Sequence, residues 1–185
     1  MYLIVGLGNP ESDYSKTRHN MGFNVINKIS EQYEIDVNKN KFKGLFGTGQ
    51  IEGEKILLLK PQTYMNLSGE SVKEIVDFYK IDLDNIIVIY DDIDIEPGKI
   101  KIKKCGGPGT HNGMKSVVNE LGSQNFKRVR VGIGSPEKKD DLINYVIGHI
   151  PEEDARTLEK GVLEAKDAIV EILKNGIDIA MNKFN

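Results

Sequence analysis

The opening segment of this chain constrains its fold more than any other stretch. An apolar, β-branched run at residues 2–5 ends abruptly at Gly6-x-Gly8, which predicts a buried strand followed by a turn. A polar loop then leads to His19, where a helical pattern of apolar residues begins. Asn9 is therefore expected at the carboxyl end of a strand and His19 at the amino end of a helix. Open α/β sheets build their sites at such ends.

A glycine pair after a strand suggests a dinucleotide site, but the rest of that motif is missing. The third glycine of G-x-G-x-x-G would fall where this chain has Glu11. Pro10 and a loop of about ten residues also separate the glycines from the helix. The first-turn amides of the helix therefore cannot contact a pyrophosphate directly after the strand, and the pattern does not favour nucleotide binding.

The remaining strand and helix signals alternate along the chain. Two strands are expected to form a hairpin, at 42–51 and 55–60, and three more are expected at 85–92, where the strand runs into two carboxylates, at 99–104 and at 127–134. Helices are expected near 20–33, from Ser68 or Ser71 to about 79, at 113–121 and at 151–175, and a further short helix can follow the last one. This order predicts an α/β fold in a single domain over residues 1–185. We expect a twisted, mixed and mostly parallel sheet flanked by helices.

Composition indicates the compartment. The single cysteine, Cys105, excludes an internal disulfide and fits a reducing environment. The amino terminus lacks the charged and apolar regions of a secretion signal, and no run approaches the roughly 18 apolar residues of a membrane span. We therefore expect a soluble, cytoplasmic protein without a membrane partner.

Charge is distributed unevenly. The whole chain carries −3, yet residues 99–130, here called the basic segment, hold eight cations and one acid, a charge of +7. Lys99, Lys101 and Lys103 alternate with isoleucines, so they share one face of a strand. An ordinary solvated surface is the more common explanation of such a segment. The alternative is a local docking surface for a polyanion.

Several polar residues stand at the predicted ends of elements, namely Asn9, His19, Asn66, Asp91 and His111-Asn112. Each has a local explanation as a turn or cap residue, but together they can converge at one edge of the sheet. An imidazole beside a carboxylate makes a general base, and neutral amides suit orientation of a water and stabilisation of an oxyanion. The sequence has no G-x-S-x-G elbow and no clear activating partner for Cys105, so a water nucleophile fits best.

Two questions remain open from the residues alone. The three histidines are scattered and lack metal-ligand spacing, but the carboxylates at 91–96 leave a Mg²⁺ site as an alternative. His19 and His111 are each followed by asparagine, and nothing in the pattern decides which of them would be the base. Residues 135–141 form a polar break before the apolar stripe Leu142, Ile143, Val146 and Ile147, which suggests either a gate over a channel or an ordinary surface helix.

Five blocks of the chain resemble bacterial peptidyl-tRNA hydrolase in order and spacing. They are VGLGNP…Y…TRHNMGF, KPQTYMNLSG, YDDIDIEPGKIKIK, GGPGTHNGMKSV and FKRVRVGIG, and the likeness extends to the terminal AMNKFN. The departures are mild: Tyr64 replaces a common phenylalanine, and Pro108-Gly109-Thr110 varies the glycine loop. These departures bear on pocket shape rather than on the chemistry.

The resemblance implies a function and a role for particular residues. The substrate would be an N-blocked aminoacyl- or peptidyl-tRNA, cleaved at its ester by a metal-independent, cofactor-free monomer that binds the acceptor stem and 3′ end. His19 would be the base oriented by Asp91; Asn9, Asn66 and Asn112 would contact the substrate or the attacking water; Tyr14 would lie near the tRNA 3′ end; Tyr64 and Met65 would line the channel; Lys101, Lys103 and Arg130 would bind tRNA phosphate. Two alternatives are a non-catalytic RNA-binding module and a metal-dependent phosphohydrolase.

Overall fold

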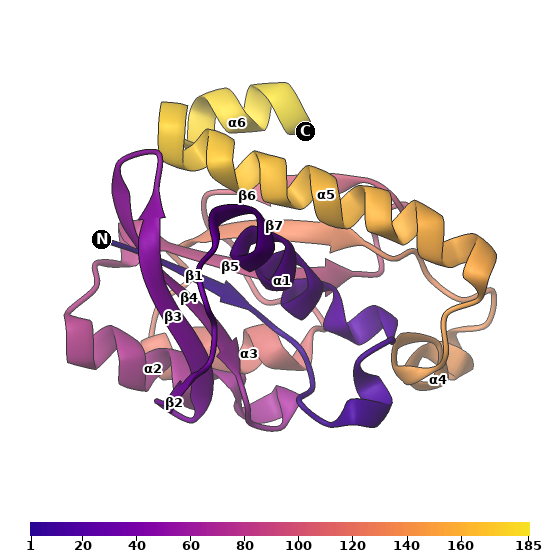
Figure 1. The fold of residues 1–185 in the computed structure, drawn as a ribbon. Helices are drawn as coiled ribbons and strands as arrows, with labels where there is room; N and C mark the ends of the chain where they lie inside the picture. Colours follow the sequence, from indigo (N-terminus) through magenta and orange to yellow (C-terminus); the bar gives the residue numbers. More distant parts are fainter.

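The computed structural model describes residues 1–185 and contains one seven-stranded sheet between two layers of helices (Figure 1). The strands are β1 (Tyr2–Gly6), β2 (Lys39–Lys41), β3 (Gly44–Ile51), β4 (Glu54–Pro61), β5 (Ile86–Asp92), β6 (Ile100–Lys103) and β7 (Lys127–Gly132). The helices are α1 (Met21–Tyr33), α2 (Ser68–Tyr79), α3 (Asn112–Leu121), α4 (Leu142–Ile147), α5 (Glu152–Asn175) and α6 (Ile177–Phe184).

The strand order is β2-β3-β4-β1-β5-β7-β6. The four central strands, β4, β1, β5 and β7, are mutually parallel, whereas β2 and β3 at one edge and β6 at the other pair antiparallel. The predicted α/β class with a mixed sheet is confirmed. Because the central strands are parallel, their carboxyl ends all lie along the same side of the sheet, here called its carboxyl edge.

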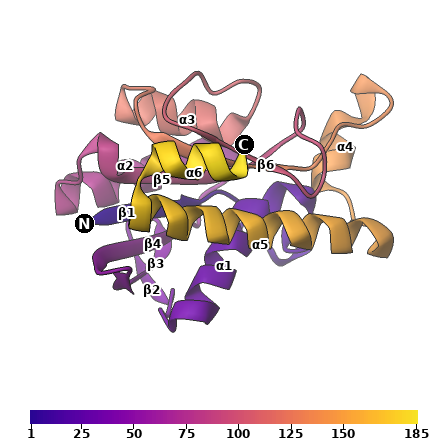
Figure 2. The ribbon, with the colours of Figure 1, turned by 90° about the horizontal axis from the view of Figure 1, so that it is seen from above.

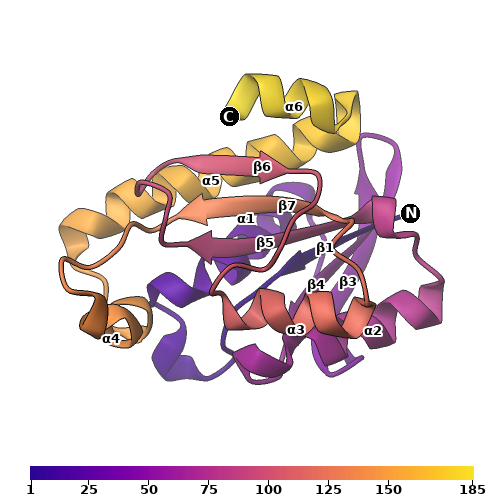
Figure 3. The same cartoon turned by 180° about the vertical axis from the view of Figure 1, so that it is seen from behind.

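Each face of the sheet carries its own hydrophobic core. In β1, Ile4 belongs to the core under α1 and α5, whereas Leu3 and Val5 belong to the core under α2 and α3. Figure 2 shows α5 and α6 on the near side, and Figure 3 shows α2 and α3 beneath the sheet on the opposite side. The central strands are thus buried on both faces, which explains their continuous apolar runs.

Two of the early glycines serve close packing. A Cβ atom at Gly6 would lie 2.2 Å from the carbonyl oxygen of Gly22, and a Cβ at Gly22 would lie 2.4 Å from the amide nitrogen of Leu7. The first turn of α1 therefore rests directly against the carboxyl end of β1. These glycines allow the residues just before α1 to approach the sheet edge, which is a structural reason for the glycine pattern that needs no nucleotide.

The predicted strand at 42–51 begins later than expected. Phe42 and Lys43 have φ values of 59° and 52° and form a turn between β2 and β3. The Phe42 side chain is 6% exposed and packs against Phe46, so its burial in the core stabilises this left-handed backbone. β2, which was not expected from the sequence, pairs with β3 on the far side of this turn.

The longest helix, α5, is an amphipathic cover for the sheet. It spans 24 residues, with Leu158, Val162 and Ile169 buried and acidic residues in its first turn. No helix of this protein has both the length and the apolar content that a membrane crossing requires.

At the carboxyl edge, the helices that follow the neighbouring strands β1 and β4 pack on opposite faces of the sheet. α1 follows β1 onto one face, and α2 follows β4 onto the other. In open α/β sheets such a switch creates a crevice outside the strand ends. The last two residues of β5, Asp91 and Asp92, lie beside this crevice, and Asp91 pairs in register with Val131 of β7.

Candidate active site

His19 is held by the loop that precedes α1. It lies in a short 3₁₀ turn, Arg18–Asn20, directly before the helix. The backbone N–H of Asn9 donates to Oδ1 of Asn20 at 2.7 Å, and Nδ2 of Asn20 donates to the carbonyl of Asn9 at 3.0 Å. This reciprocal pair ties the end of β1 to the turn that carries the imidazole. The loop is therefore a fixed platform for His19.

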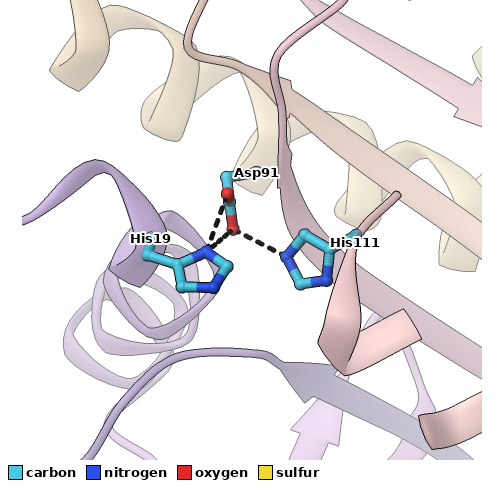
Figure 4. A group of neighbouring side chains, drawn as sticks. All are labelled: His19, Asp91 and His111. Carbon is cyan, nitrogen blue, oxygen red and sulfur yellow. Dashed lines mark hydrogen bonds and ion pairs between the residues drawn. The ribbon is translucent and has the colours of Figure 1, made fainter. Parts of the chain in front are cut away.

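Asp91 is the centre of a three-residue hydrogen-bonded group. Its side chain is 3% exposed at the end of β5, where Nδ1 of His19 lies 2.9 Å from Oδ2 and Nε2 of His111 lies 2.9 Å from Oδ1. Figure 4 shows the two imidazoles on opposite sides of the carboxylate, His19 from the turn before α1 and His111 from the start of α3. Three segments far apart in sequence thus meet at the sheet edge.

The hydrogen bonds assign the tautomer of each imidazole. Nδ1 of His111 accepts the backbone N–H of Met114 at 3.2 Å, so the proton of this ring sits on Nε2, which donates to Asp91. Both nitrogens of His111 are therefore engaged. His19 donates from Nδ1 to the same carboxylate, which leaves Nε2 unprotonated and without a hydrogen-bond partner in the protein. Only His19 presents a free basic nitrogen.

The pKa values of this group are coupled through Asp91. Burial works to raise the pKa of Asp91, but the adjoining imidazoles of His111 and His19 outweigh burial and hold it well below its usual range. Burial works to lower the pKa of His19, yet the charge and hydrogen bond of Asp91 raise it above the ordinary value. The arrangement thus favours a carboxylate that stabilises protonated His19.

A cavity of about 320 Å³ opens beside this group. His19, Asp91 and His111 lie on its wall together with the turn after β5, the glycine loop at 107–110 and three apolar residues of α4. The α4 residues are Leu142, Ile143 and Val146. Lys103 and Arg130 line the same space, so cationic side chains and the imidazole of His19 face one cavity.

The structure gathers some of the predicted site residues more closely than others. His19, Asp91, Asn112, Lys103 and Arg130 border the cavity. The others, namely Asn9, Tyr14, Tyr64, Met65, Asn66 and Lys101, lie outside its lining. Two of these contact residues next to the lining: Asn9 is bonded to Asn20, which follows His19, and Sδ of Met65 would be 2.7 Å from a Cβ placed at Gly113, which follows Asn112. Tyr64 and Asn66 are exposed beside Met65, and Tyr14 is half-buried on the turn at Ser12–Tyr14.

Sequence reasoning missed two parts of this site. It left His111 as a rival of His19 rather than as a second partner of Asp91, although both histidines precede helices at the same sheet edge. It also missed that Asp92 pairs with Arg130 at 3.2 Å, because the alternation of β5 and β7 does not show their register. A prediction that β5 and β7 pair in parallel would have placed Asp92 near Arg130.

Some cations of the basic segment are bound to other groups of the protein, and others are free. Lys99 pairs with Glu96, Lys104 pairs with Asp178, and Lys127 donates to the carbonyl of Asp84. Arg128 is fully buried and donates to three backbone carbonyls. Lys101, Lys103 and Lys115 are exposed and make no ion pair. Two of these cations are thus paired with acids and two are held by backbone carbonyls, so the free cations concentrate on β6 and α3.

The three ligand-type atoms of His19, Asp91 and His111 lie within 4.8 Å of one another, which is close enough to test for a metal ion. A metal on Nε2 of His111 would require a proton on Nδ1, where the N–H of Met114 already points. The nearby Asp92 accepts the N–H of Asp94 and pairs with Arg130. Apart from Nε2 of His19, the ligand atoms of these residues are thus engaged in protein hydrogen bonds or ion pairs.

Comparison with known proteins identifies close relatives. A sequence model of the family described as Peptidyl-tRNA hydrolase matches residues 3–185. The peptidyl-tRNA hydrolase of Clostridium perfringens strain SM101 is 54% identical over the whole chain and 97% of its own length, and that of Thermoanaerobacter sp. strain X514 is 51% identical over the full length of both. The crystal structure of peptidyl-tRNA hydrolase from Acinetobacter baumannii, at 40% identity, matches all of this chain and 94% of its own with a TM-score of 0.94.

Proposed function

Because the chain belongs to the peptidyl-tRNA hydrolase family, we propose that its His19–Asp91 pair activates the water that cleaves the ester of peptidyl-tRNA. The protein is a hydrolase that separates the peptide from its tRNA. The observation that carries the mechanism is the free Nε2 of His19, on a ring whose Nδ1–H is fixed by a buried carboxylate. No other imidazole in the group offers a lone pair.

The reaction follows from this geometry. Nε2 of His19 takes a proton from water as the oxygen attacks the ester carbonyl carbon, and Asp91 stabilises the resulting imidazolium. The carbonyl oxygen gains negative charge in the tetrahedral intermediate. The imidazolium then returns its proton to the departing 3′-oxygen of the terminal ribose, so free peptide acid and free tRNA result. The base is regenerated without a covalent enzyme intermediate.

We assign the stabilisation of this charge to three neutral amides, of which one lines the cavity and two lie on neighbouring loops. Asn112 lines the cavity, and Asn9 lies on the loop tied to the His19 turn. Oδ1 of Asn9 accepts the N–H of Glu11 at 3.1 Å, which orients its amide group and leaves the NH₂ as a donor. With exposed Asn66, these side chains supply donors that orient the water and stabilise the oxyanion.

The substrate-facing wall combines aromatic and apolar residues. Tyr64 is 65% exposed, and the neighbouring Met65 is buried against Gly113, which follows Asn112. We assign this wall to the peptide and the terminal nucleotides, with Tyr14 near the tRNA 3′ end. Exposed aromatic rings suit stacking with unpaired bases.

The cationic face of β6 and β7 fits the acceptor-stem phosphates. Lys101 pairs in register with Arg130 across these strands, and Lys103 lies two residues further along the same face. Arg130 gives one donor to Asp92, and its Nε has no partner. Since Lys103 and Arg130 border the same cavity as His19, a phosphate held there lies close to the ester. Such contacts position the tRNA without reading its sequence.

The proposal also includes a monomeric enzyme in the cytoplasm. The His19–Asp91–His111 group is complete within one chain, which supports a monomer. Cys105 is exposed and unpaired, as befits a reducing cytoplasm.

Hydrolysis of N-acetyl-aminoacyl-tRNA by the purified protein tests the proposal. His19→Ala should lower kcat by about 10² or more while tRNA binding persists, because the general base is lost. His149→Ala, which changes an exposed histidine outside the group, serves as the control. Full activity of the His19 variant would contradict the mechanism. Binding without hydrolysis by the wild-type protein would favour an RNA-binding module, and loss of activity in chelator would favour a metal enzyme.

A further inference from the structure

His111 contacts the proposed catalytic pair without offering a base of its own. Its ring is 8% exposed and lies with its centroid 5.0 Å from that of His19. One nitrogen receives the N–H of Met114 at the start of α3, and the other donates to Oδ1 of Asp91. The carboxylate that orients His19 therefore shares its negative charge between two N–H donors.

We propose that His111 is a positioning residue: a neutral N–H donor that draws charge of Asp91 away from His19 and so sets the pH at which His19 becomes an active base. This inference rests on the proposed role of His19 as the base. It assigns to the first turn of α3 a chemical task, because the N–H of Met114 keeps His111 in the tautomer that donates to the carboxylate.

The direction of the effect follows from electrostatics. Protonated His19 is stabilised by the negative charge of Asp91, and every other hydrogen bond to that carboxylate weakens this stabilisation. Removal of the His111 donor would concentrate the charge on His19 and raise the pKa of His19. Because the reaction needs His19 unprotonated, the acid limb of the pH–rate profile would move to higher pH.

Other charged groups near the pair remain in place when His111 is changed. Those lining the shared cavity are Asp92 and Asp94 after β5, Lys103 of β6 and Arg130 of β7, with the phenol of Tyr90 also on its wall. The ring of Tyr90 packs edge-on to His111 at 5.1 Å, and Asp92 is paired with Arg130. α4 contributes only apolar side chains to this wall. On the flanking elements, Arg18 pairs with Asp154, and Lys115 of α3 is exposed. A change at His111 alone therefore leaves these other charges unchanged.

Two substitutions separate this donor from the shape of the ring. His111→Phe keeps a ring of similar size, fills the space against Tyr90 and removes the donor. His111→Gln places an amide NH₂ near the position of Nε2 and keeps a donor to Asp91. Both lose the acceptor for the N–H of Met114, so the cap of α3 cannot explain a difference between them. His149→Phe is the control for a histidine replaced away from the site.

The experiment measures the pKa of His19 by ¹⁵N NMR of the imidazoles and, in parallel, the pH dependence of kcat/KM. The Phe variant should raise the pKa of His19 and the acid limb by roughly 1 unit, the scale for losing a hydrogen bond to a charged group. The Gln variant should stay within a few tenths of the wild type. Equal values in Phe and Gln variants, shifted or unshifted, would overturn the proposal.

The wild-type spectrum provides a test that needs no variant to fold. In the neutral form of its ring, His111 should show an unprotonated Nδ1 and a protonated Nε2. A neutral His111 ring with its proton on Nδ1 would overturn the proposal. The NMR titration does not depend on turnover, so it distinguishes a failure here from a failure of the proposed catalysis. The latter would be revealed by an active His19→Ala enzyme.

Discussion

Replacement of Asp91 by asparagine tests the tautomer argument most directly. Asparagine keeps the shape of the side chain but offers one acceptor oxygen and one NH₂ group. His111 cannot change tautomer, because its Nδ1 already accepts the N–H of Met114, so its Nε2–H takes the single oxygen. The NH₂ group then faces His19 and requires an unprotonated Nδ1. The proton of His19 moves to Nε2, the atom that must accept a proton from water.

The magnitude of this effect is large for kcat and moderate for stability. A base held in the wrong tautomer in the serine-protease triad loses about 10⁴ in kcat, and we expect a loss of that order here. The free energy of unfolding should fall by about 1–3 kcal/mol, because two hydrogen bonds to a charged carboxylate become bonds between neutral groups. Asp91→Asn should also lower the pKa of His19, because the carboxylate that raises it is gone.

The pH window of the stability loss follows from the two shifts. The pKa of Asp91 is depressed in the folded protein, so its contribution is present above the unfolded value near 3.9 and is lost as pH falls. The pKa of His19 is raised, so its contribution is full below the unfolded value near 6.5 and is lost as pH rises through the folded value. The difference in stability between wild type and variant should therefore be greatest between about pH 4 and 6.5.

The assay is single-turnover hydrolysis of N-acetyl-aminoacyl-tRNA from pH 5 to 9, with urea unfolding across the same range. Asp92→Asn is the matched control, because it changes the neighbouring carboxylate, which pairs with Arg130 and not with an imidazole. The control should alter KM and leave kcat within a few-fold. A kcat loss below tenfold in the Asp91 variant, or an equal loss in both variants, would refute the reasoning.

Three further outcomes are expected. Alanine at Lys101 or Arg130 should raise KM for full peptidyl-tRNA and make the salt dependence of the logarithm of the tRNA-binding constant shallower by about 0.7–0.9. Hydrolysis of a minimal substrate without the tRNA body should be unaffected, and equal losses on both substrates would contradict phosphate docking. Hydrogen exchange over 135–147 should be faster than in β5 if this segment gates the cavity, and exchange as slow as in β5 would exclude a gate. Gly22→Ala should lower the free energy of unfolding by about 3 kcal/mol, since its Cβ would lie 2.4 Å from backbone, and a loss below 1 kcal/mol would argue against this close packing.

The order of elements was predictable because it depends on local patterns. The central strands are continuous apolar runs, and α5 shows a clear helical period, so both were located from the sequence. The turn at Phe42-Lys43 was not, because neither residue is typical of a left-handed conformation. Its conformation is stabilised by tertiary burial of the Phe42 ring rather than by local preference.

The surface charge of the basic segment was overestimated from the sequence for a similar reason. A count of cations does not show which of them meet acids from distant elements, as Lys104 meets Asp178 of α6. Burial also removes Arg128 from the surface entirely. What the sequence did predict, through strand alternation, is that Lys101 and Lys103 share one face, and these two cations remain exposed and unpaired.

The choice between His19 and His111 shows most clearly what lies beyond sequence patterns. Both histidines precede a helix, both are followed by asparagine, and both reach the same carboxylate. The difference is one backbone N–H, that of Met114, which points at Nδ1 of His111 and has no counterpart at His19. That contact fixes one imidazole as a donor with no lone pair to spare. The other imidazole keeps a free lone pair at the cavity wall, so the first turn of α3 determines which histidine can accept a proton from water.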